Sequence, residues 1–537
     1  MIHIHAADLF FALLKKAGVK RIYGIPGDEL EIFDALAYSG IQFITTRHEQ
    51  AAAFMAEGEA KMSGRIGICI CTLGPGATNL ATAIADAYQN RVPLLALSGQ
   101  LGKEFHKPPL AHQFIDLEKL FRPITKATFS IRNADQLEQV IQQAIDTALM
   151  PKPGPVHVSL PIDVMEEIIN PARLKNHLLL DGRPRVKISS QNLKQAIRLL
   201  KTSSYPVAFF GEISQRFDPA FVKALVKAKI PVMTSFLGKG GFPESNDWSL
   251  GVVSRHVKDA LASVIERADL FLVCGYDYIE GVSPSIFAGK RIINIDIITA
   301  AADGLLKADE EALGDPFLLT GRLAALINMN TVDSDWDVSE IIPVRQARLR
   351  QIIQPDSRSA FPYNPFRVMQ ILQEVTAGNE IIVSDVGVHK QVIALGYNTD
   401  RPLGVHFSNG LSSMGFSLPF AAGARFNCPP SRTIISINGD GGFLMNMQDL
   451  ETIRRYNLDV KIIVFVDNAF GMIKANLLQK YNRAKFLNFD NPEFGALARS
   501  FGIRYLRPGR SDADLRHKLK LLLHTKGPIL LPIPVKY

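Results

Sequence analysis

Short apolar runs alternate with longer amphipathic stretches along the first third of the chain. Each run is only a few residues long and almost continuously apolar, as expected of strands that are buried on both faces. The runs cover residues 21–24, 41–45, 67–72, 93–98 and 156–160. Strands that alternate with helices predict a parallel sheet covered by helices on both faces.

The last third repeats the pattern, with strand-like runs at 380–384, 433–437, 461–466 and 528–533. The first and the last third of the chain also end in similar segments. Residues 154–161 read Gly-Pro-Val-His-Val-Ser-Leu-Pro, and residues 527–534 read Gly-Pro-Ile-Leu-Leu-Pro-Ile-Pro. This internal similarity predicts two related α/β domains.

A third α/β unit is expected between them, with strands near 207–210, 232–235, 270–274 and 291–295. The polar stretch 170–187 and the segment 331–363, which is punctuated by Pro, Asp and Ser, are the expected linkers. We therefore expect three parallel-sheet α/β domains over residues 1–175, 190–332 and 364–537.

Composition narrows the function classes. With 47% hydrophobic and 21% charged residues, the 537-residue chain is not disordered and can build several cores. Its net charge of +8 is spread without long basic runs, which favours small anionic substrates over nucleic acid. No 18-residue apolar run or signal peptide is found, so no membrane span is expected.

Four cysteines make no disulfide framework. Cys69 and Cys71 alternate within an apolar strand-like run, which favours a buried pair of small hydrophobic side chains over a metal site. Free thiols of this kind predict a reducing, cytoplasmic location.

Two carboxylates stand out in the last third. Asp440 lies in the turn Gly439-Asp440-Gly441-Gly442 directly after a strand-like run, and Asp467 follows the next run. The turn alone is equally typical of a strand followed by a capped helix. The pair, however, could hold Mg²⁺, which takes one or two protein oxygens and shares the oxygens of a diphosphate.

This spacing resembles that of the thiamine diphosphate enzymes, in which Gly-Asp-Gly is followed at such an interval by Asn-Asn. Alignment on Phe470 and Gly471 puts Val466 and Asp467 where the family has its asparagines. The resemblance implies a pyrimidine-binding first domain, a Rossmann-like middle domain and a diphosphate-binding last domain. It implies metal ligation by Asp440, Asp467 and the carbonyl of Ala469.

Further residues are assigned through the resemblance. Glu49, in the segment Arg47-His48-Glu49, would bind N1′ of the aminopyrimidine and assist proton transfer there. Met414 would support the bent cofactor, and the Gly410 carbonyl would accept from its 4′-amino group. The remaining expected cofactor contacts are His389, Gly439, Gly441, Gly442 and Phe470.

Within that family the chain looks closest to the acetolactate synthases, particularly the catabolic, flavin-independent type. The stretches that carry this likeness are 112–113, 121–126, 275–280, 408–410 and 480–483. Gln113 would then face the bound 2-oxo acid. FAD is not expected, since the segment that would bind it reads Phe210-Gly211-Glu212-Ile213, with an acid where the backbone must approach closely.

The implied reaction is decarboxylation of a 2-oxo acid, pyruvate in the first instance, with ligation to a second carbonyl. The implied assembly is a homodimer or homotetramer whose active sites lie between subunits. A plain decarboxylase is less favoured, because the candidate for a paired-histidine segment reads Leu110-Ala111-His112-Gln113.

Position 476 leaves the identity of the substrates open. Asn476 stands where the catabolic synthases carry a substrate-facing glutamine, so a carboligase with a different donor or acceptor, similar to carboxyethylarginine synthase, is a second candidate. A non-catalytic regulatory homologue, a protein of a different class, is disfavoured because Glu49, Asp440 and Asp467 are intact.

Overall fold

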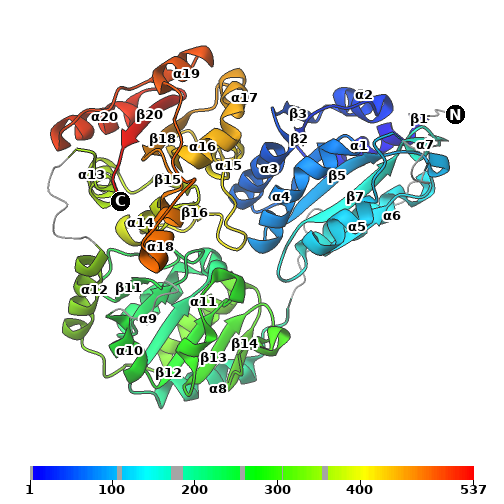
Figure 1. Ribbon diagram of the computed structural model, residues 1–537. Helices are drawn as coiled ribbons and strands as arrows, with labels where there is room; N and C mark the ends of the chain where they lie inside the picture. The colour runs from blue at the N-terminus through cyan, green and yellow to red at the C-terminus, as the bar shows by residue number, and fades with distance from the viewer. Residues whose placement is uncertain (1–3, 106–111, 171–185, 254–259, 305, 353–360) are drawn as a thin grey trace.

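The computed structural model describes residues 4–105, 112–170, 186–253, 260–304, 306–352 and 361–537. Figure 1 shows three lobes: the first domain in blue and cyan, the middle domain in green, and the last domain in yellow to red. Each lobe is built on a six-stranded parallel sheet covered by helices. The three expected α/β units are therefore confirmed.

The first domain has strand order β3-β2-β4-β5-β7-β6, and an antiparallel pair β1-β8 ties its ends together. Its strands are β1 (Ile4–His5), β2 (Arg21–Gly24), β3 (Gln42–Thr45), β4 (Gly67–Cys71), β5 (Leu94–Gln100), β6 (Ala127–Ser130), β7 (Val156–Pro161) and β8 (Ile168–Ile169). Its helices are α1 (Ala6–Lys16), α2 (Leu30–Tyr38), α3 (Glu49–Ser63), α4 (Pro75–Gln89), α5 (Leu117–Phe121), α6 (Leu137–Leu149) and α7 (Ile162–Met165).

The last domain has strand order β16-β15-β17-β18-β20-β19. Its strands are β15 (Ile381–Ser384), β16 (Val405–Phe407), β17 (Ile434–Gly439), β18 (Val460–Val466), β19 (Arg504–Tyr505) and β20 (Ile529–Pro534). Its helices are α13 (Pro365–Val375), α14 (Val388–Gly396), α15 (Ser417–Arg425), α16 (Asp440–Asn446), α17 (Leu450–Arg455), α18 (Gly471–Tyr481), α19 (Phe494–Ser500) and α20 (Asp512–His524). Numbered along the chain, the six strands of each outer sheet run 2-1-3-4-6-5, so the predicted relation between the two domains is confirmed.

The middle sheet has order β11-β10-β9-β12-β13-β14, the 3-2-1-4-5-6 arrangement of Rossmann-like folds. Its strands are β9 (Pro206–Phe210), β10 (Val232–Thr234), β11 (Ser249–Val252), β12 (Leu270–Cys274), β13 (Arg291–Asp296) and β14 (Glu310–Leu313). The helices of this part of the chain are α8 (Ser190–Lys201), α9 (Pro219–Lys227), α10 (Leu261–Arg267), α11 (Pro316–Met329) and α12 (Val338–Ile352).

The segment expected as the second linker contains α12 and is more ordered than its composition indicates. Ile341 is fully buried, and the Arg348 guanidinium donates to the main-chain oxygens of Leu250 and Val252, which lie at β11. The segment therefore closes the edge of the middle sheet. Most of the first expected linker, and with it the boundary at residue 175, lies outside the described residues.

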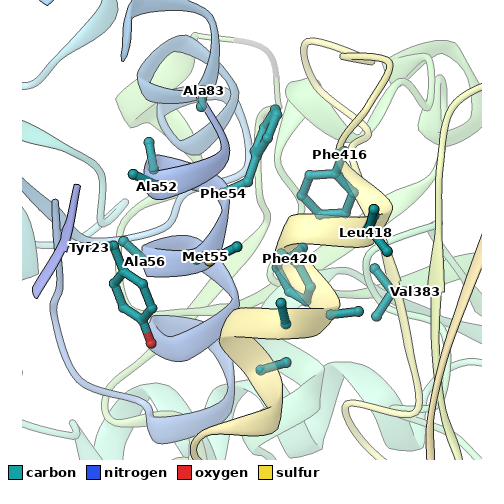
Figure 2. Close-up of a cluster of buried hydrophobic side chains, with 14 of the residues drawn as sticks. Tyr23, Ala52, Phe54, Met55, Ala56, Ala83, Val383, Phe416, Leu418 and Phe420 are labelled. Carbon is teal, nitrogen blue, oxygen red and sulfur yellow. The ribbon is translucent and has the colours of Figure 1, made fainter. Parts of the chain in front are cut away.

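The first and last domains of one chain share a core, centred on α3 and α15 (Figure 2). A Cβ on Gly58 would lie 2.1 Å from the Phe420 carbonyl oxygen, and one on Gly423 would lie 1.9 Å from that of Met55. The two backbones therefore approach each other only because both positions are glycine. Next to this contact, Phe54 and Phe416 pack edge to face, with ring centroids 5.4 Å apart.

Two expectations from composition can be checked here. Cys69 and Cys71 are both buried and free, as expected. Across the described ranges, no helix combines the length and the apolar character that a membrane crossing requires.

Candidate active site

Asp440 and Asp467 lie at the carboxyl edge of the last sheet because their strands are neighbours. β17 and β18 run parallel, with Gly439 paired to Phe465, so the residues that follow them leave the sheet side by side. Ligand sites of open α/β sheets form at this edge. Asp440 and Asp467, which the sequence predicts to act together, therefore lie close together in space.

Four donors orient the Asp440 carboxylate. It accepts from the main-chain N–H groups of Gly441 at 2.9 Å, Asp467 at 3.2 Å and Asn468 at 2.7 Å, and from the Asn491 side-chain amide at 2.7 Å. A carboxylate held in this way is fixed in direction before any cation binds. Asn491 lies outside every motif in the sequence.

Burial and a neighbouring negative charge both disfavour the ionised form of the Asp467 carboxyl. Burial raises its pKa to about 6, and the charge of Asp440 acts in the same direction. A divalent cation between the two groups would relieve that repulsion. The described residues contain no cluster of three or more His, Cys, Asp or Glu side chains suited to a metal, so such a cation would need main-chain or phosphate oxygens as well.

The neighbouring Asn468 is engaged elsewhere. Its side-chain oxygen accepts from the Asn491 amide at 2.7 Å, and its main chain has φ 55°, in the left-handed region. This geometry supports the alignment that makes Asp467, rather than Asn468, the candidate ligand.

A cavity of about 130 Å³ opens beside these carboxylates. It is lined by Val386, Gly387, Val388, His389, Met414, Gly439, Asp440, Gly441, Gly442, Asp467, Ala469, Phe470, Gly471, Met472, Ile473 and Tyr537. All the last-domain residues predicted for the cofactor, except Gly410, line this one cavity. No described residue of the first domain lines it.

His389 brings a ring nitrogen that lacks a partner among the described residues to this cavity. His389 is 2% exposed and its Nε2 has no hydrogen-bond partner in the described structure, which is costly unless a ligand supplies one. Burial lowers the pKa of His389 to about 4, so the ring is neutral at pH 7. A Cβ on Gly442 would lie 2.1 Å from the Asp385 carboxylate, so only glycine allows this turn.

Asp385 is a site residue whose contacts sequence reasoning missed. Its buried carboxylate accepts from the main-chain N–H groups of Gly415 at 3.0 Å and Phe416 at 3.3 Å. Burial raises the pKa of Asp385 to about 7. Because these donors follow Met414 directly, Asp385 fixes the loop that carries the expected cofactor support.

Glu49 lies at the corresponding edge of the first sheet, as the first residue of α3. The residue is 7% exposed, and its carboxylate accepts from the Asn79 amide at 3.0 Å. Asn79 belongs to α4, whose turn at Gly74 lies against the main chain of Gln113. Glu49 and Gln113 therefore flank one loop, while the neighbours Leu110 and Ala111 lie outside the described residues.

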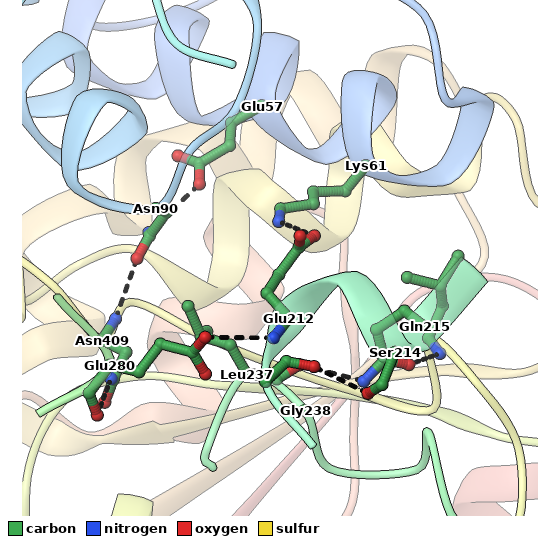
Figure 3. A network of polar contacts seen from close by, with 12 residues as sticks. Glu57, Lys61, Asn90, Glu212, Ser214, Gln215, Leu237, Gly238, Glu280 and Asn409 are labelled. Atoms are coloured by element: carbon green, nitrogen blue, oxygen red, sulfur yellow. Dashed lines mark hydrogen bonds and ion pairs between the residues drawn. The ribbon is translucent and has the colours of Figure 1, made fainter. Parts of the chain in front are cut away.

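Gly410 is held by the first domain of the same chain, next to the contact between Asn90 and Asn409 that Figure 3 shows. The Asn90 side-chain oxygen accepts from the main-chain N–H groups of Asn409 at 3.2 Å and Gly410 at 3.3 Å, and its amide donates to Glu57 at 3.2 Å. A Cβ on Gly410 would come within 2.6 Å of both Gln89 and Ile279. All three domains meet at this loop.

Comparison with known proteins finds three matching family domains. Residues 4–119 match the N-terminal TPP binding domain of thiamine pyrophosphate enzymes, residues 193–323 the central domain, and residues 385–533 the C-terminal TPP binding domain. A probable acetolactate synthase large subunit of Methanocaldococcus jannaschii is 34% identical over 98% of this chain and 91% of its own length.

Two bacterial relatives are also similar over most of the chain. The acetolactate synthase large subunit of Lactococcus lactis is 31% identical over 93% of this chain and 88% of its own length. The acetolactate synthase isozyme 3 large subunit of Escherichia coli is 30% identical over 96% and 92%. The chain therefore belongs to the thiamine pyrophosphate enzymes, as a thiamine pyrophosphate-dependent enzyme of the acetolactate synthase-like kind.

Proposed function

We propose that the chain decarboxylates pyruvate and joins the resulting two-carbon unit to a second 2-oxo acid. The observation that carries the proposal is the single cavity formed by paired carboxylates, an unpartnered buried imidazole nitrogen and glycine turns. The names of the relatives, acetolactate synthases, supply the reaction class.

Mg²⁺ would be held by the carboxylates of Asp440 and Asp467 and by the main-chain oxygen of Ala469. Ala469 is 7% exposed and its main chain pairs with Asn488, which fixes the direction of that segment. His389 Nε2 and the N–H groups of Gly441 and Gly442 would contact the diphosphate, since N–H groups at a helix start favour anions. Gly439 and Phe470 border the same site.

When bound, thiamine diphosphate supplies a carbon nucleophile and an electron sink for the decarboxylation. Glu49 would hold a proton at N1′ of the pyrimidine, and Asn79 keeps its carboxylate in place at 3.0 Å. Met414 would support the bent cofactor and the Gly410 carbonyl would accept from the 4′-amino group. Gln113 would orient the substrate carbonyl.

The complete site requires a second copy of the chain in this proposal. Glu49 and the diphosphate cavity lie in different domains, and no described first-domain residue lines that cavity. The neighbouring α18 buries none of its residues, and its Ile473 and Leu478 are exposed apolar side chains. Leu411 and Met445, elsewhere in the last domain, are exposed apolar side chains as well. A homodimer, or a homotetramer built from it, would cover this surface.

FAD is not part of the proposal. Glu212 follows Gly211 at the end of β9, and its carboxylate forms an ion pair with Lys61 of α3 at 2.9 Å (Figure 3). A Cβ on Gly211 would lie 2.0 Å from the Gly275 carbonyl oxygen, so the segment already packs against protein. The purified protein should therefore be colourless.

The test is incubation of the protein with pyruvate, thiamine diphosphate and Mg²⁺, without oxygen or an electron acceptor, followed by product identification. CO₂ and acetolactate are expected. Acetaldehyde as the main product would replace the proposal with a 2-oxo acid decarboxylase. Turnover only of a phosphorylated or larger substrate would shift it to a carboxyethylarginine synthase-like carboligase, and Asn476 would be the first residue to vary.

A further inference from the structure

Two carboxyl groups of the first domain are buried on either side of one amide. Glu57 of α3 is 1% exposed, and Asp86 of α4 is fully buried. Both accept from the side-chain nitrogen of Asn90, Glu57 at 3.2 Å and Asp86 at 2.7 Å. Two ionised carboxylates in one buried place would repel each other strongly, so the pair keeps at least one proton.

The hydrogen bonds show which carboxyl carries that proton. Glu57 Oε1 accepts from the amide, whereas Glu57 Oε2 has no partner among the described residues and can hold a hydrogen. Both oxygens of Asp86 already accept, Oδ2 from Asn90 and Oδ1 from the Ser408 hydroxyl. Burial raises the pKa of Glu57 well above the usual range, and it raises the pKa of Asp86 to about 7.

Charged groups on other elements act on both carboxyls. Lys390 of α14 favours the ionised form of Asp86, and the carboxylate of Asp385, directly after β15, opposes it. Lys61, on the same helix as Glu57, favours the ionised form of Glu57, but burial acts more strongly in the other direction. Above neutral pH the pair therefore consists of a protonated Glu57 and an ionised Asp86.

A loop of the last domain, residues 408–413, is anchored on this pair. The Ser408 hydroxyl accepts from the Ser413 main-chain N–H at 2.7 Å and donates its own hydrogen to Asp86. This direction of the bonds requires an acceptor at Asp86, which the ionised carboxylate provides best. Met414, the residue expected to support the cofactor, follows the loop directly.

Asn90 holds the middle of the same loop. Its side-chain oxygen accepts from the N–H groups of Asn409 and Gly410, and Figure 3 shows the bonds that link Glu57, Asn90 and Asn409. The oxygen of this amide faces the loop because its nitrogen is held by Glu57 and Asp86. The carboxyl pair therefore orients the amide that holds the main chain at Gly410.

We propose that Asp86 is a positioning residue for the loop 408–413 of its own chain, acting through Ser408. Glu57 and Asn90 hold its carboxylate in place. The inference rests on the proposed function for the contact between this loop and the cofactor and for the location of the site between two subunits.

In that arrangement one helix serves two active sites. Glu49, the first residue of α3, would face the last domain of the partner chain. Glu57 lies roughly two turns further along α3 and supports the loop of its own chain, which belongs to the other site. A change at Asp86 should therefore act on the site that the Glu49 of the same chain does not serve.

Binding of thiamine diphosphate with Mg²⁺ to the cofactor-free protein tests the positioning without turnover. At pH 8, Asp86→Asn keeps the size of the side chain but loses its charge, and should weaken binding roughly 10- to 100-fold. Glu57→Gln makes the same change at the protonated carboxyl and should stay within a few-fold. Asp34→Asn, at an exposed position of α2, is the control and should have no effect. Calorimetric titration measures all four affinities.

The pH dependence separates positioning from a purely structural role. A protonated Asp86 resembles Asn, so the affinity ratio of the parent to Asp86→Asn should be largest above pH 7. The ratio should fall towards 1 at about pH 5.5, because Asp86 takes up its proton over this range. Other groups that titrate here are common to both proteins and cancel from the ratio. Damaged packing alone would give a ratio that does not depend on pH.

A second variant guards against misfolding of the first. Ser408→Ala removes the hydroxyl that links Asp86 to the loop and leaves the bonds of the carboxyl pair to Asn90 in place. It should weaken cofactor binding several-fold. In the Ser408→Ala background, Asp86→Asn should add little, because the two changes break the same connection.

Mixed dimers test the assignment to two sites. A Glu49→Gln chain and an Asp86→Asn chain are co-expressed with different affinity tags, and the mixed dimer is isolated. One site then carries both changes and the other carries neither, so about half of the bound cofactor should exchange its C2 proton at the parent rate. Proton exchange followed by NMR measures this fraction.

Three results would overturn the inference: an affinity ratio near 1 at pH 8, a ratio that does not change with pH, or full additivity of Asp86→Asn and Ser408→Ala. A mixed dimer without parent-rate sites, together with the expected ratios, would support the positioning role and reject the site between subunits. Expected ratios in a protein that forms no acetolactate would support the positioning role and reject the proposed reaction separately.

Discussion

The first and last domains share one topology but present different chemistry at the same edge of the sheet. In both, the third strand of the six-stranded sheet, counted along the chain, leads through a glycine-containing turn into a helix. In the first domain this turn is at Gly74, followed by Pro75 and an amide, Asn79. In the last domain it is Gly439 to Gly442, which carries the carboxylate of Asp440.

The shared topology therefore determines where each site lies, at the carboxyl edge of the sheet, and a few side chains determine which chemistry each site can perform. The first-domain edge presents the buried carboxylate of Glu49 with an amide donor beside it. The last-domain edge presents two carboxylates and a neutral imidazole around a cavity. One edge suits proton transfer to a heterocycle, and the other suits a cation with a diphosphate.

Loss of the first-domain carboxylate should have the largest effect. Glu49→Gln keeps the side chain's size but not its proton transfer, so exchange of the cofactor's C2 proton should slow by about 10²- to 10⁴-fold. Proton exchange followed by NMR measures this rate, and thiamine diphosphate affinity should stay within a few-fold. An exchange rate close to that of the parent would remove Glu49 from the proton path.

Loss of a last-domain carboxylate should act through the metal. Asp467→Ala should weaken cofactor binding by roughly 10- to 100-fold at low Mg²⁺ and less at high Mg²⁺, since the cation and the diphosphate share ligands. Asn468→Ala is the matched control, because its side chain pairs with Asn491 and should leave the Mg²⁺ dependence nearly unchanged. The reverse pattern would mean that the alignment at Asp467 is wrong.

The joint between the two domains can be tested separately from their edges. Asn90→Ala leaves the N–H groups of Asn409 and Gly410 without their acceptor, which should lower the free energy of unfolding by about 1–3 kcal/mol. Unfolding in urea measures this change in the free energy of unfolding. Asn133→Ala, at an exposed position without a capping bond, should change stability by only a few tenths of that and serves as the control.

The smallest effect concerns pH. Burial lowers the pKa of His157 in the first domain to about 3, below its ordinary value of 6.5. The unfolded chain therefore takes up a proton that the folded chain refuses, so stability falls as pH decreases, by about 1 kcal/mol per histidine between pH 6.5 and 5.5. His157→Phe should flatten this part of the curve, whereas His517→Gln, at an exposed position, should not. Parallel curves for the parent and His157→Phe would contradict the assignment.

Local sequence was enough to find the central strands and was not enough to find most of the edges. The strands that sequence analysis missed in the large sheets, β6, β11, β14, β16 and β19, all lie at a sheet edge. An edge strand is short and has one free side, so it lacks the continuous apolar run that marks a buried parallel strand. α12 was missed for a similar reason, since its few buried positions are spaced along a largely polar segment.

The sequence by itself determined the three α/β units and the candidate carboxylates, because both depend on local patterns: apolar runs, glycine turns and the residues that follow strands. Only the tertiary structure decided which groups orient them. Asn491 reaches Asp440 across 51 positions, and Asn90 reaches Gly410 across 320. Lys390 likewise meets Phe236 only because two domains pack together. Such contacts depend on how separate elements are placed in space, and no local periodicity records that placement.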